Sequence, residues 1–247
     1  MHKERISVCM ASYNGEQYIE KQIESILAQL NEEDELIVID DRSKDKTAGI
    51  ISTFQDSRIR FFQNHSNQGV VKTFERAIKL AVNDYIFLAD QDDLWTEQRI
   101  EKILEIFRKN PCMLVTGNLS AIDKNDKKIN IYLGTLHAED SCRYLKNIVG
   151  IFFGTAFYYG CAMGFRKELK EVILPIPKYI EAHDLWIAMA ANLQKSNFHL
   201  EETVLYHRIH EKNVTTSHRK MIQKIYSRII FAGALITLSK RVAKQRI

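Results

Sequence analysis

The feature that most constrains the fold is the alternation of short apolar runs and longer amphipathic stretches over the first 95 residues. Apolar runs lie at residues 5–14, 36–39, 59–64 and 85–90, and stretches such as 15–30 and 70–82 repeat apolar residues at helical spacing. Strands that alternate with helices of about 10–15 residues are typical of βαβ units. The unbroken apolar run 36–39 fits a strand covered on both faces. The pattern therefore predicts an α/β fold with a mostly parallel central sheet and flanking helices.

Three of these predicted strands end in polar segments, namely Ser12-Tyr13-Asn14, Asp40-Asp41 and Asp90-Gln91-Asp92. The carboxyl ends of parallel strands meet at one edge of the sheet, where α/β proteins bind their ligands. Clustered acids are tolerated there when a divalent cation neutralises them, and Mg²⁺ and Mn²⁺ prefer such oxygen ligands. A solvated turn that caps the next helix is the simpler alternative for the same residues.

The rest of the chain is predicted to continue one domain up to residue 216. We expect a strand near 112–123, short helices near 141–150 and 166–177, and a helix that begins near Asp184. Residues 157–165 are small and aromatic and favour a strand, and 198–213 form one or two strands with a charged end. Only three prolines occur, and no Pro-rich linker marks a boundary.

Residues 217–247 form a second unit, predicted to be a basic amphipathic helical tail. This segment holds eight Lys and Arg and no acid, so the net charge of +4 on the whole chain leaves −4 on residues 1–216. The tail favours either peripheral contact with an anionic membrane or packing and dimerisation. The acidic body and the lack of a binding motif argue against nucleic acid as a partner.

Composition indicates a cytoplasmic location, with the inner face of the plasma membrane as a further site for the tail. The N-terminus lacks the apolar run of a signal peptide, and no apolar stretch reaches 18 residues. The four cysteines form no Cys-x-x-Cys pair and mostly lie in apolar stretches, as buried free thiols do in a reducing compartment.

The segments "ISVCMASYNGEQYIEKQIESILAQ", "DELIVIDDRSKDKT", "NQGVVKTFERAI" and "YIFLADQDDLW" resemble, in order and spacing, the family 2 glycosyltransferases. The resemblance extends from residue 5 to about residue 215, and "DQDDLW" and "HDLW" are most similar to a bacterial subgroup that includes rhamnosyltransferases. It implies the GT-A fold, a Rossmann-like fold, and a nucleotide-sugar donor.

The resemblance also implies roles for individual residues. Asp184 matches the catalytic base, with a first-turn acid of its helix as the alternative, and Asp92 matches the ligand of the metal, Mg²⁺ or Mn²⁺. His210 matches a position near the donor diphosphate and is expected to contact the metal or the diphosphate, with a surface histidine as the alternative. The residues that match nucleotide-binding positions are Ala11, Ser12, Tyr13, Asp41 and Asp90. Further donor or acceptor contacts are expected from Asp40, Gln91, Asp93, Trp95, Cys161, His183, Arg208 and Asn213. For His183, a structural role and a role as a second base both stay open, and Cys161 lines either the sugar site or a packed strand.

The reaction implied is an inverting, metal-dependent transfer from a dTDP- or UDP-linked sugar, with dTDP-rhamnose and UDP-hexose as candidate donors. The acceptor is a hydroxyl of a glycan or a polyprenyl-linked glycan of the bacterial surface. This displacement requires at least two groups: a carboxylate base near the acceptor and a metal site at the leaving diphosphate. The alternatives are a nucleotidyltransferase, although "SYNGEQY" lacks a basic phosphate loop, and a non-catalytic nucleotide-sugar-binding module.

Overall fold

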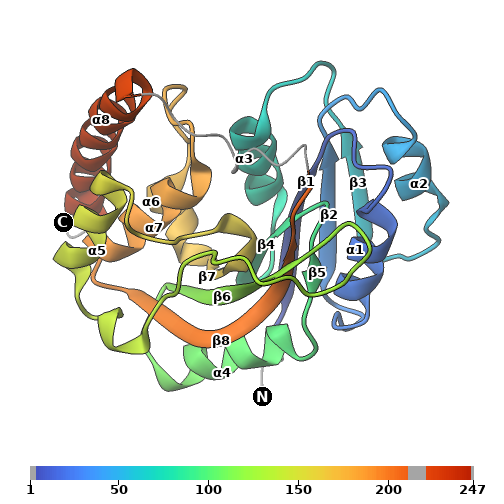
Figure 1. Cartoon of the computed structure of the whole chain (residues 1–247), viewed down its shortest axis with the longest axis horizontal. Helices are drawn as coiled ribbons and strands as arrows, with labels where there is room; N and C mark the ends of the chain where they lie inside the picture. Colours follow the sequence, from blue (N-terminus) through green and yellow to red (C-terminus); the bar gives the residue numbers. More distant parts are fainter. Residues whose placement is uncertain (1–3, 211–220, 246–247) are drawn as a thin grey trace.

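The four apolar segments of the first 95 residues form the parallel part of one sheet. They are β1 (Ile6–Ser12), β2 (Glu35–Asp40), β3 (Ile59–Gln63) and β4 (Tyr85–Asp90). They lie in the order β3-β2-β1-β4, and each neighbouring pair is parallel. The computed structural model in Figure 1 describes residues 4–210 and 221–245.

The second half of the chain extends this sheet with mixed pairing. β7 (Met163–Arg166) is antiparallel to β4 and to β6 (Leu114–Ile122), and β8 (Asn197–Arg208) is parallel to β6. The two-residue strand β5 (Leu94–Trp95) closes the edge against β8, which gives the order β3-β2-β1-β4-β7-β6-β8-β5. The predicted strand at 157–165 begins only at Met163, because the preceding Gly160–Ala162 form a short 3₁₀ turn, η2.

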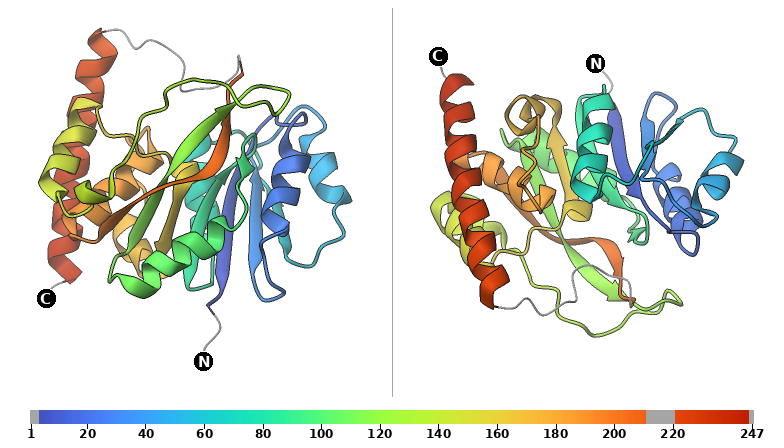
Figure 2. Two further views of the ribbon diagram at one scale, coloured as in Figure 1. Left: turned by 60° about the horizontal axis from the view of Figure 1, so that its bottom comes forward. Right: turned by 90° about the horizontal axis from the view of Figure 1, so that it is seen from above.

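Helices cover both faces of the sheet (Figure 2). Those of the first half are α1 (Ile19–Leu27), α2 (Thr47–Thr53), α3 (Val70–Leu80) and α4 (Arg99–Lys109). Those of the second half are α5 (Tyr144–Phe153), α6 (Lys170–Ile173), α7 (His183–Leu193) and α8 (Met221–Gln245). Two further 3₁₀ turns are η1 (Ala138–Asp140) and η3 (Lys167–Leu169).

The sheet separates two hydrophobic cores. Ile37 and Ile39 of β2 join the core that contains α3, α7 and α8, whereas Leu36 and Val38 join the core beneath α1 and α4. All four side chains are fully buried. This two-sided burial accounts for the unbroken apolar run in the sequence, since side chains of a strand alternate between faces.

The predicted helical tail is present as α8, which packs on the domain. Its inward side chains Ile230, Ala234, Leu238 and Val242 follow one another at four-residue spacing and are buried in the core that α7 shares. Gln194 and Gln245 are hydrogen-bonded across the ends of these two helices. The predicted boundary at residue 216 lies outside the described residues. Across the part of the chain that the structure describes, no helix is both long enough and apolar enough to cross a membrane.

Candidate active site

The polar ends of β1, β2 and β4 lie side by side, as predicted. The strand register pairs Ala11 with Asp90 and Ser12 with Asp40, so the last residues of all three strands share one edge of the sheet. The Gln22 side chain of α1 donates a 2.8 Å hydrogen bond to the carbonyl of Asp90 and holds the end of β4 beneath that helix. The candidate site lies at this edge of the sheet.

The Asp41 carboxylate shapes the loop that precedes α3. It accepts hydrogen bonds from the Asn64 amide at 2.7 Å and from the backbone N–H groups of Gln68 and Gly69 at 2.8 Å each. Gly69 has a φ of +82°, which favours glycine at this turn. A carboxylate has about four acceptor positions, so three protein donors leave Asp41 room for one ligand donor.

Asp40 is buried in a turn of its own. Its carboxylate accepts hydrogen bonds from the Ser43 N–H at 3.0 Å and from the Gln63 amide at 2.9 Å, and it also contacts the Ser43 hydroxyl and Ser12. These bonds fix the turn that follows β2. The structure therefore gives Asp40 a supporting position behind Asp41 rather than one open to a ligand.

Gln91 ties the end of β4 to the end of β1. Its side-chain amide accepts a hydrogen bond from the Tyr13 N–H at 2.8 Å and donates one to the Tyr13 carbonyl at 3.0 Å. A Cβ on Gly15 would lie 2.2 Å from the Gln91 Oε1, so a glycine at that position leaves room for the amide. Tyr13 remains 40% exposed, with its ring available to a ligand.

The acidic segment is Asp90–Asp93, at the end of β4, and its Asp90 and Asp92 are partly buried. Burial, and next the charges of Asp93 and Asp92, raise the pKa of Asp90 to about 8. The Asp92 carboxylate lies 2.9 Å from the Nε2 of His210, which lies just past the end of β8. Neighbouring carboxylates such as those of Asp90, Asp92 and Asp93 repel one another. A bound proton or cation reduces this repulsion.

Asp93 is fully buried and forms a pair with His207. Its Oδ1 lies 2.8 Å from the His207 Nδ1 and accepts the backbone N–H of Arg208 at 3.1 Å. Burial of His207 opposes its protonation, but the hydrogen bond and the charge of Asp93 outweigh this effect and raise its pKa to about 9. His207 could not be recognised from the sequence, where its only signal was its position directly before Arg208 in a predicted strand.

Arg208 holds the acidic segment from behind. Its guanidinium donates to the carbonyls of Asp92 at 2.8 Å and Asp123 at 2.9 Å, pairs with the Asp126 carboxylate, and lies 4.6 Å from the centre of the Tyr18 ring. The side chain is fully buried. Arg208 thus supports the loop, and Asn213, which was predicted beside it, lies outside the described residues.

Asp184 lies in the first turn of α7. Its Oδ1 accepts the N–H of Leu185 at 2.8 Å, and its charge contributes to the raised pKa of Asp90. A Cβ on Gly160 would lie 3.4 Å from the Cβ of Asp184 and 2.8 Å from the His183 ring, so η2 fits closely against the start of α7.

His183 is a packed residue. Its ring stacks on Phe74 at 4.2 Å between centroids, and burial lowers the pKa of the imidazole. A buried neutral ring that faces the core supports the structural alternative for this residue, and leaves Asp184 as the carboxylate at the start of α7.

The prediction for Trp95 is wrong. It was predicted to contact donor or acceptor, but its side chain is buried in the core, where it packs beside Phe87 and lies 4.1 Å beneath the Arg99 guanidinium. The reason is the short strand β5, whose pairing with Leu205 of β8 directs Trp95 inward.

Two groups of side chains have donor atoms for a metal ion. Asp93, Cys161 and His207 place a carboxylate, a thiol and an imidazole within 4.8 Å of one another, but all three are buried. The pKa of the Cys161 thiol is raised well above its ordinary value by burial and by Asp93. Hard cations prefer oxygen ligands to thiols.

Asp92 and His210, which are only partly buried, provide the carboxylate and imidazole that suit Mn²⁺ or Mg²⁺, with Asp90 beside them.

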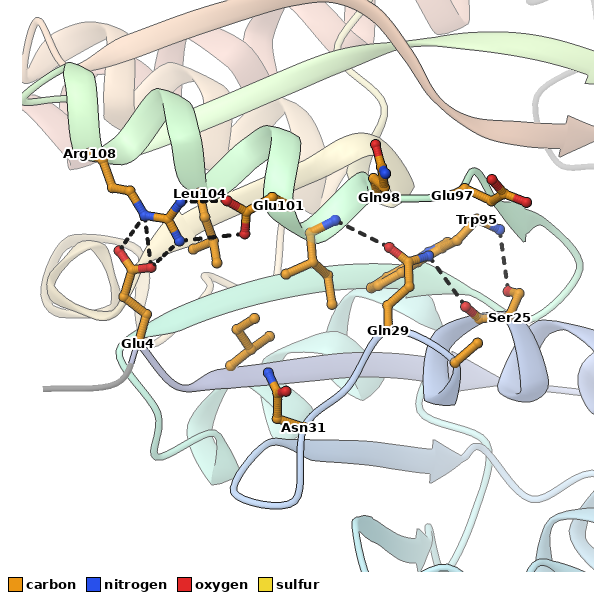
Figure 3. A pocket seen from close by; sticks show the side chains of 13 residues that line it. Glu4, Ser25, Gln29, Asn31, Trp95, Glu97, Gln98, Glu101, Leu104 and Arg108 are labelled. Atoms are coloured by element: carbon orange, nitrogen blue, oxygen red, sulfur yellow. Dashed lines mark hydrogen bonds and ion pairs between the residues drawn. The ribbon is translucent and has the colours of Figure 1, made fainter. Parts of the chain in front are cut away.

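A groove of about 570 Å³ lies at the opposite end of the sheet and belongs to another surface (Figure 3). Its lining comes from the start of β1, the end of α1 and the outer side of α4. Arg108 bonds to Glu4 and Glu101 in this groove, and the Gln29 amide accepts the N–H of Ile100 at 3.3 Å. Glu4, Glu101 and Arg108 are thus paired with one another at one end of this groove.

Comparison with known proteins identifies the family. Residues 7–174 match the family model described as glycosyl transferase family 2. The chain is 30% identical over 220 residues to an uncharacterized glycosyltransferase of Nostoc sp., an alignment that covers 85% of this chain and 66% of that protein. It is 34% identical over 120 residues to the UDP-Glc:alpha-D-GlcNAc-diphosphoundecaprenol beta-1,3-glucosyltransferase WfgD of Escherichia coli, covering 49% of this chain and 47% of that one.

A further relative is TuaG of Bacillus subtilis, a putative teichuronic acid biosynthesis glycosyltransferase that is 24% identical over 233 residues and matches 91% of this chain and 86% of its own length. Among solved structures, S. aureus TarS 1–349 in complex with UDP-GlcNAc superposes with a TM-score of 0.73 at 19% identity, over 93% of this chain and 66% of TarS. This likeness shows the GT-A fold. The chain belongs to the family 2 glycosyltransferases.

Proposed function

We propose that this chain catalyses the inverting transfer of a sugar from a nucleoside diphosphate donor to a hydroxyl group of a glycan or lipid-linked acceptor. The observation that carries the proposal is the packing of Asp184 next to the acidic segment through η2. A Cβ on Gly160 would lie 3.4 Å from the Cβ of Asp184, and the thiol of the next residue, Cys161, lies within 4.8 Å of the Asp93 carboxylate. Direct displacement at an anomeric carbon requires a base on one side and stabilisation of a leaving diphosphate on the other.

Asp184 is the proposed base. A sugar hydroxyl is far too weak an acid to ionise at neutral pH, so its proton moves to a carboxylate within hydrogen-bond reach as the new glycosidic bond forms. The hydrogen bond from the Leu185 N–H orients one carboxylate oxygen of Asp184 and leaves the other for the acceptor.

Ala11, Ser12, Tyr13, Asp41 and Asp90 are the proposed nucleoside contacts. They lie along the ends of β1, β2 and β4, with the Tyr13 ring exposed and the Asp41 carboxylate fixed by three donors. A fixed carboxylate with one acceptor position left suits the single N–H of a pyrimidine base.

Asp92 and His210 are the residues that would hold a divalent cation, with Asp90 at their side. Such an ion supplies Lewis acid stabilisation of the negative charge that grows on the departing diphosphate. Asp93, Cys161, His207 and Arg208 support this segment from the interior.

The donor is proposed to be a UDP-hexose, with dTDP-rhamnose as the second candidate. WfgD and WfaP of Escherichia coli both carry UDP-Glc in their names, and TarS was solved with UDP-GlcNAc. The acceptors named for WfgD and WfaP are diphosphoundecaprenol-linked, and TuaG is named for teichuronic acid biosynthesis. These names support a role in bacterial surface polysaccharide synthesis.

The test is a screen of UDP- and dTDP-linked sugars with Mn²⁺ by thermal shift, because a ligand that binds only the folded state raises the melting temperature. The sugars that stabilise the protein are then assayed for donor hydrolysis and for transfer to a polyprenyl-linked glycan. We expect one nucleotide class to stabilise the wild type and to be turned over. Stabilisation without any turnover would support a binding module, and activity with a nucleoside triphosphate and a sugar phosphate would support a nucleotidyltransferase.

A further inference from the structure

Helix α8 has two apolar faces. One packs on the domain through Ile230, Ala234, Leu238 and Val242. At 100° per residue, Ile225, Ile229 and Ile236 fall on the opposite side, and each is more than half exposed. A helix that only covers a domain is expected to be polar on its outer face. The outer face of α8 therefore has a second apolar stripe that the domain leaves uncovered.

Helix α5 extends the apolar stripe of α8. Leu145, Val149 and Phe153 follow at four-residue spacing along α5 and are between 45% and 75% exposed. The Arg228 guanidinium of α8 lies 5.9 Å from the centre of the Phe153 ring, which joins the two helices. Figures 1 and 2 show α5 beside α8, with both helices at the end of the molecule away from α2. We name the six exposed apolar residues of α5 and α8 the α5–α8 face.

The charged side chains that α5 and α8 themselves carry have one sign. Neither α5 nor α8 contains an aspartate or glutamate, whereas α8 places Arg228, Lys240 and Lys244 among or beside the apolar side chains. Two copies of the chain joined through this face would bring like charges together without an acid on either helix to pair with them. A surface of anionic lipid headgroups above an apolar interior complements both the charge and the apolar side chains.

We propose that the α5–α8 face binds the surface of an anionic phospholipid membrane. The apolar side chains insert at the level of the headgroups, and the basic side chains meet lipid phosphates. An apolar crevice beneath α8, lined by Ile180, Met189, Ile230 and Phe231, is also lined by Glu181 and Ala182, which directly precede α7. The inner side of α8 and the residues that precede α7 are thereby neighbours. This inference goes beyond the proposed function and does not depend on it, because lipid binding is measured without donor or acceptor.

The experiment is vesicle co-sedimentation of the full chain. Vesicles of phosphatidylcholine alone are compared with vesicles in which phosphatidylglycerol replaces part of it, at low and high salt. We expect binding to the anionic vesicles that weakens as salt is added, since the electrostatic part is screened. The double variant Ile229→Ser/Ile236→Ser is expected to lower the partition coefficient by roughly tenfold or more, because two apolar side chains no longer insert.

The matched control is Val82→Ser, which removes an exposed aliphatic side chain on the loop between α3 and β4. It is expected to bind vesicles as the wild type does, and circular dichroism melting verifies that all variants are folded. Equal binding of the wild type and the double variant would overturn the proposal, as would a wild type that leaves anionic vesicles unbound. A dimer in analytical ultracentrifugation that the double variant abolishes would also overturn it and would assign the face to a second copy.

Discussion

The side chains of Asp93 and His207, 114 residues apart in the chain, form a hydrogen bond of 2.8 Å in the protein interior. The pair joins the segment after β4 to the end of β8, next to the Asp92 and His210 side chains. Both side chains are nearly inaccessible to solvent, so each depends on the other for compensation of its charge.

Removing one member of this pair is expected to destabilise the fold strongly. Breaking a buried pair leaves an uncompensated charge and costs about 3–5 kcal/mol. Asp93→Asn and His207→Gln, measured by urea unfolding, should each lower stability by about that amount, and the double variant should lose less than the sum. Lys109→Gln, which breaks the exposed pair of Lys109 with Glu105, should leave stability nearly unchanged. Small and additive effects would show that the buried pair contributes little.

Stability is expected to fall as the solution becomes alkaline. His207 has a pKa of about 9 in the folded protein, against an ordinary value of 6.5. Because the folded state holds the proton more tightly, the contribution of His207 is fully present below about pH 6.5 and is lost as the pH rises through about 9. The difference in unfolding free energy between wild type and His207→Gln should therefore shrink from pH 6.5 to pH 10. A constant difference across this range would contradict the pairing.

Replacement of the proposed base should abolish transfer and spare donor binding. Asp184→Asn keeps the shape of the side chain but cannot accept the acceptor proton, so the transfer rate should fall by about 10²–10⁴-fold. The thermal shift caused by donor and Mn²⁺ should match that of the wild type. The exposed neighbour Glu181 provides the control, since Glu181→Gln should retain activity. Transfer at the wild-type rate by Asp184→Asn would exclude this residue as the base.

The two candidate metal groups can be told apart by substitution. If Mn²⁺ binds at Asp92 and His210, Asp92→Asn should remove the stabilisation by Mn²⁺, whereas Cys161→Ala should retain it relative to its own metal-free melting temperature. The reverse pattern would place the ion in the buried cluster of Asp93, Cys161 and His207. Isothermal titration of the metal alone, without donor, provides a second measurement of the same difference.

A methyl group at Gly15 should disturb the donor site without unfolding the protein. The new Cβ in Gly15→Ala would displace the Gln91 amide, which then loses its two hydrogen bonds to the backbone of Tyr13. We expect donor affinity to fall by about tenfold, since each lost bond is worth about 1 kcal/mol. Gly49→Ala is the control, because nothing lies within 4 Å of its new Cβ and alanine favours the helix. Unchanged affinity of Gly15→Ala would exclude Gln91 as the residue that positions Tyr13.

The sheet and the meeting of its polar ends could be predicted because they depend on local patterns. Continuous apolar runs identify covered strands, and parallel strands bring their carboxyl ends together regardless of the loops between them. The partners of the polar residues could not be predicted in this way. The bonds of Asp41 to residues 64–69, of Gln91 to Tyr13 and of Asp93 to His207 join segments whose approach is set by tertiary packing.

Trp95 and α8 show the same limit. The Trp95 side chain points inward because β5 pairs with β8 at Leu205, 110 positions later in the chain. A hydrophobic pattern within a few residues of Trp95 cannot reveal this pairing. The amphipathic pattern of the tail indicated a helix, and the structure shows which of its apolar stripes the domain covers. A sequence with apolar residues on two sides of a helix leaves that choice open.

The long strand β8 also determines when the site is completed as the chain is synthesised. Arg208 and His210 follow Asp92 by 116 and 118 residues, and both lie at the end of the last strand. Domains begin to fold from the N-terminus while translation continues. The nascent chain therefore displays its carboxylates long before Arg208 and His210 leave the ribosome, and the ability to hold a charged ligand arises only when β8 joins the sheet.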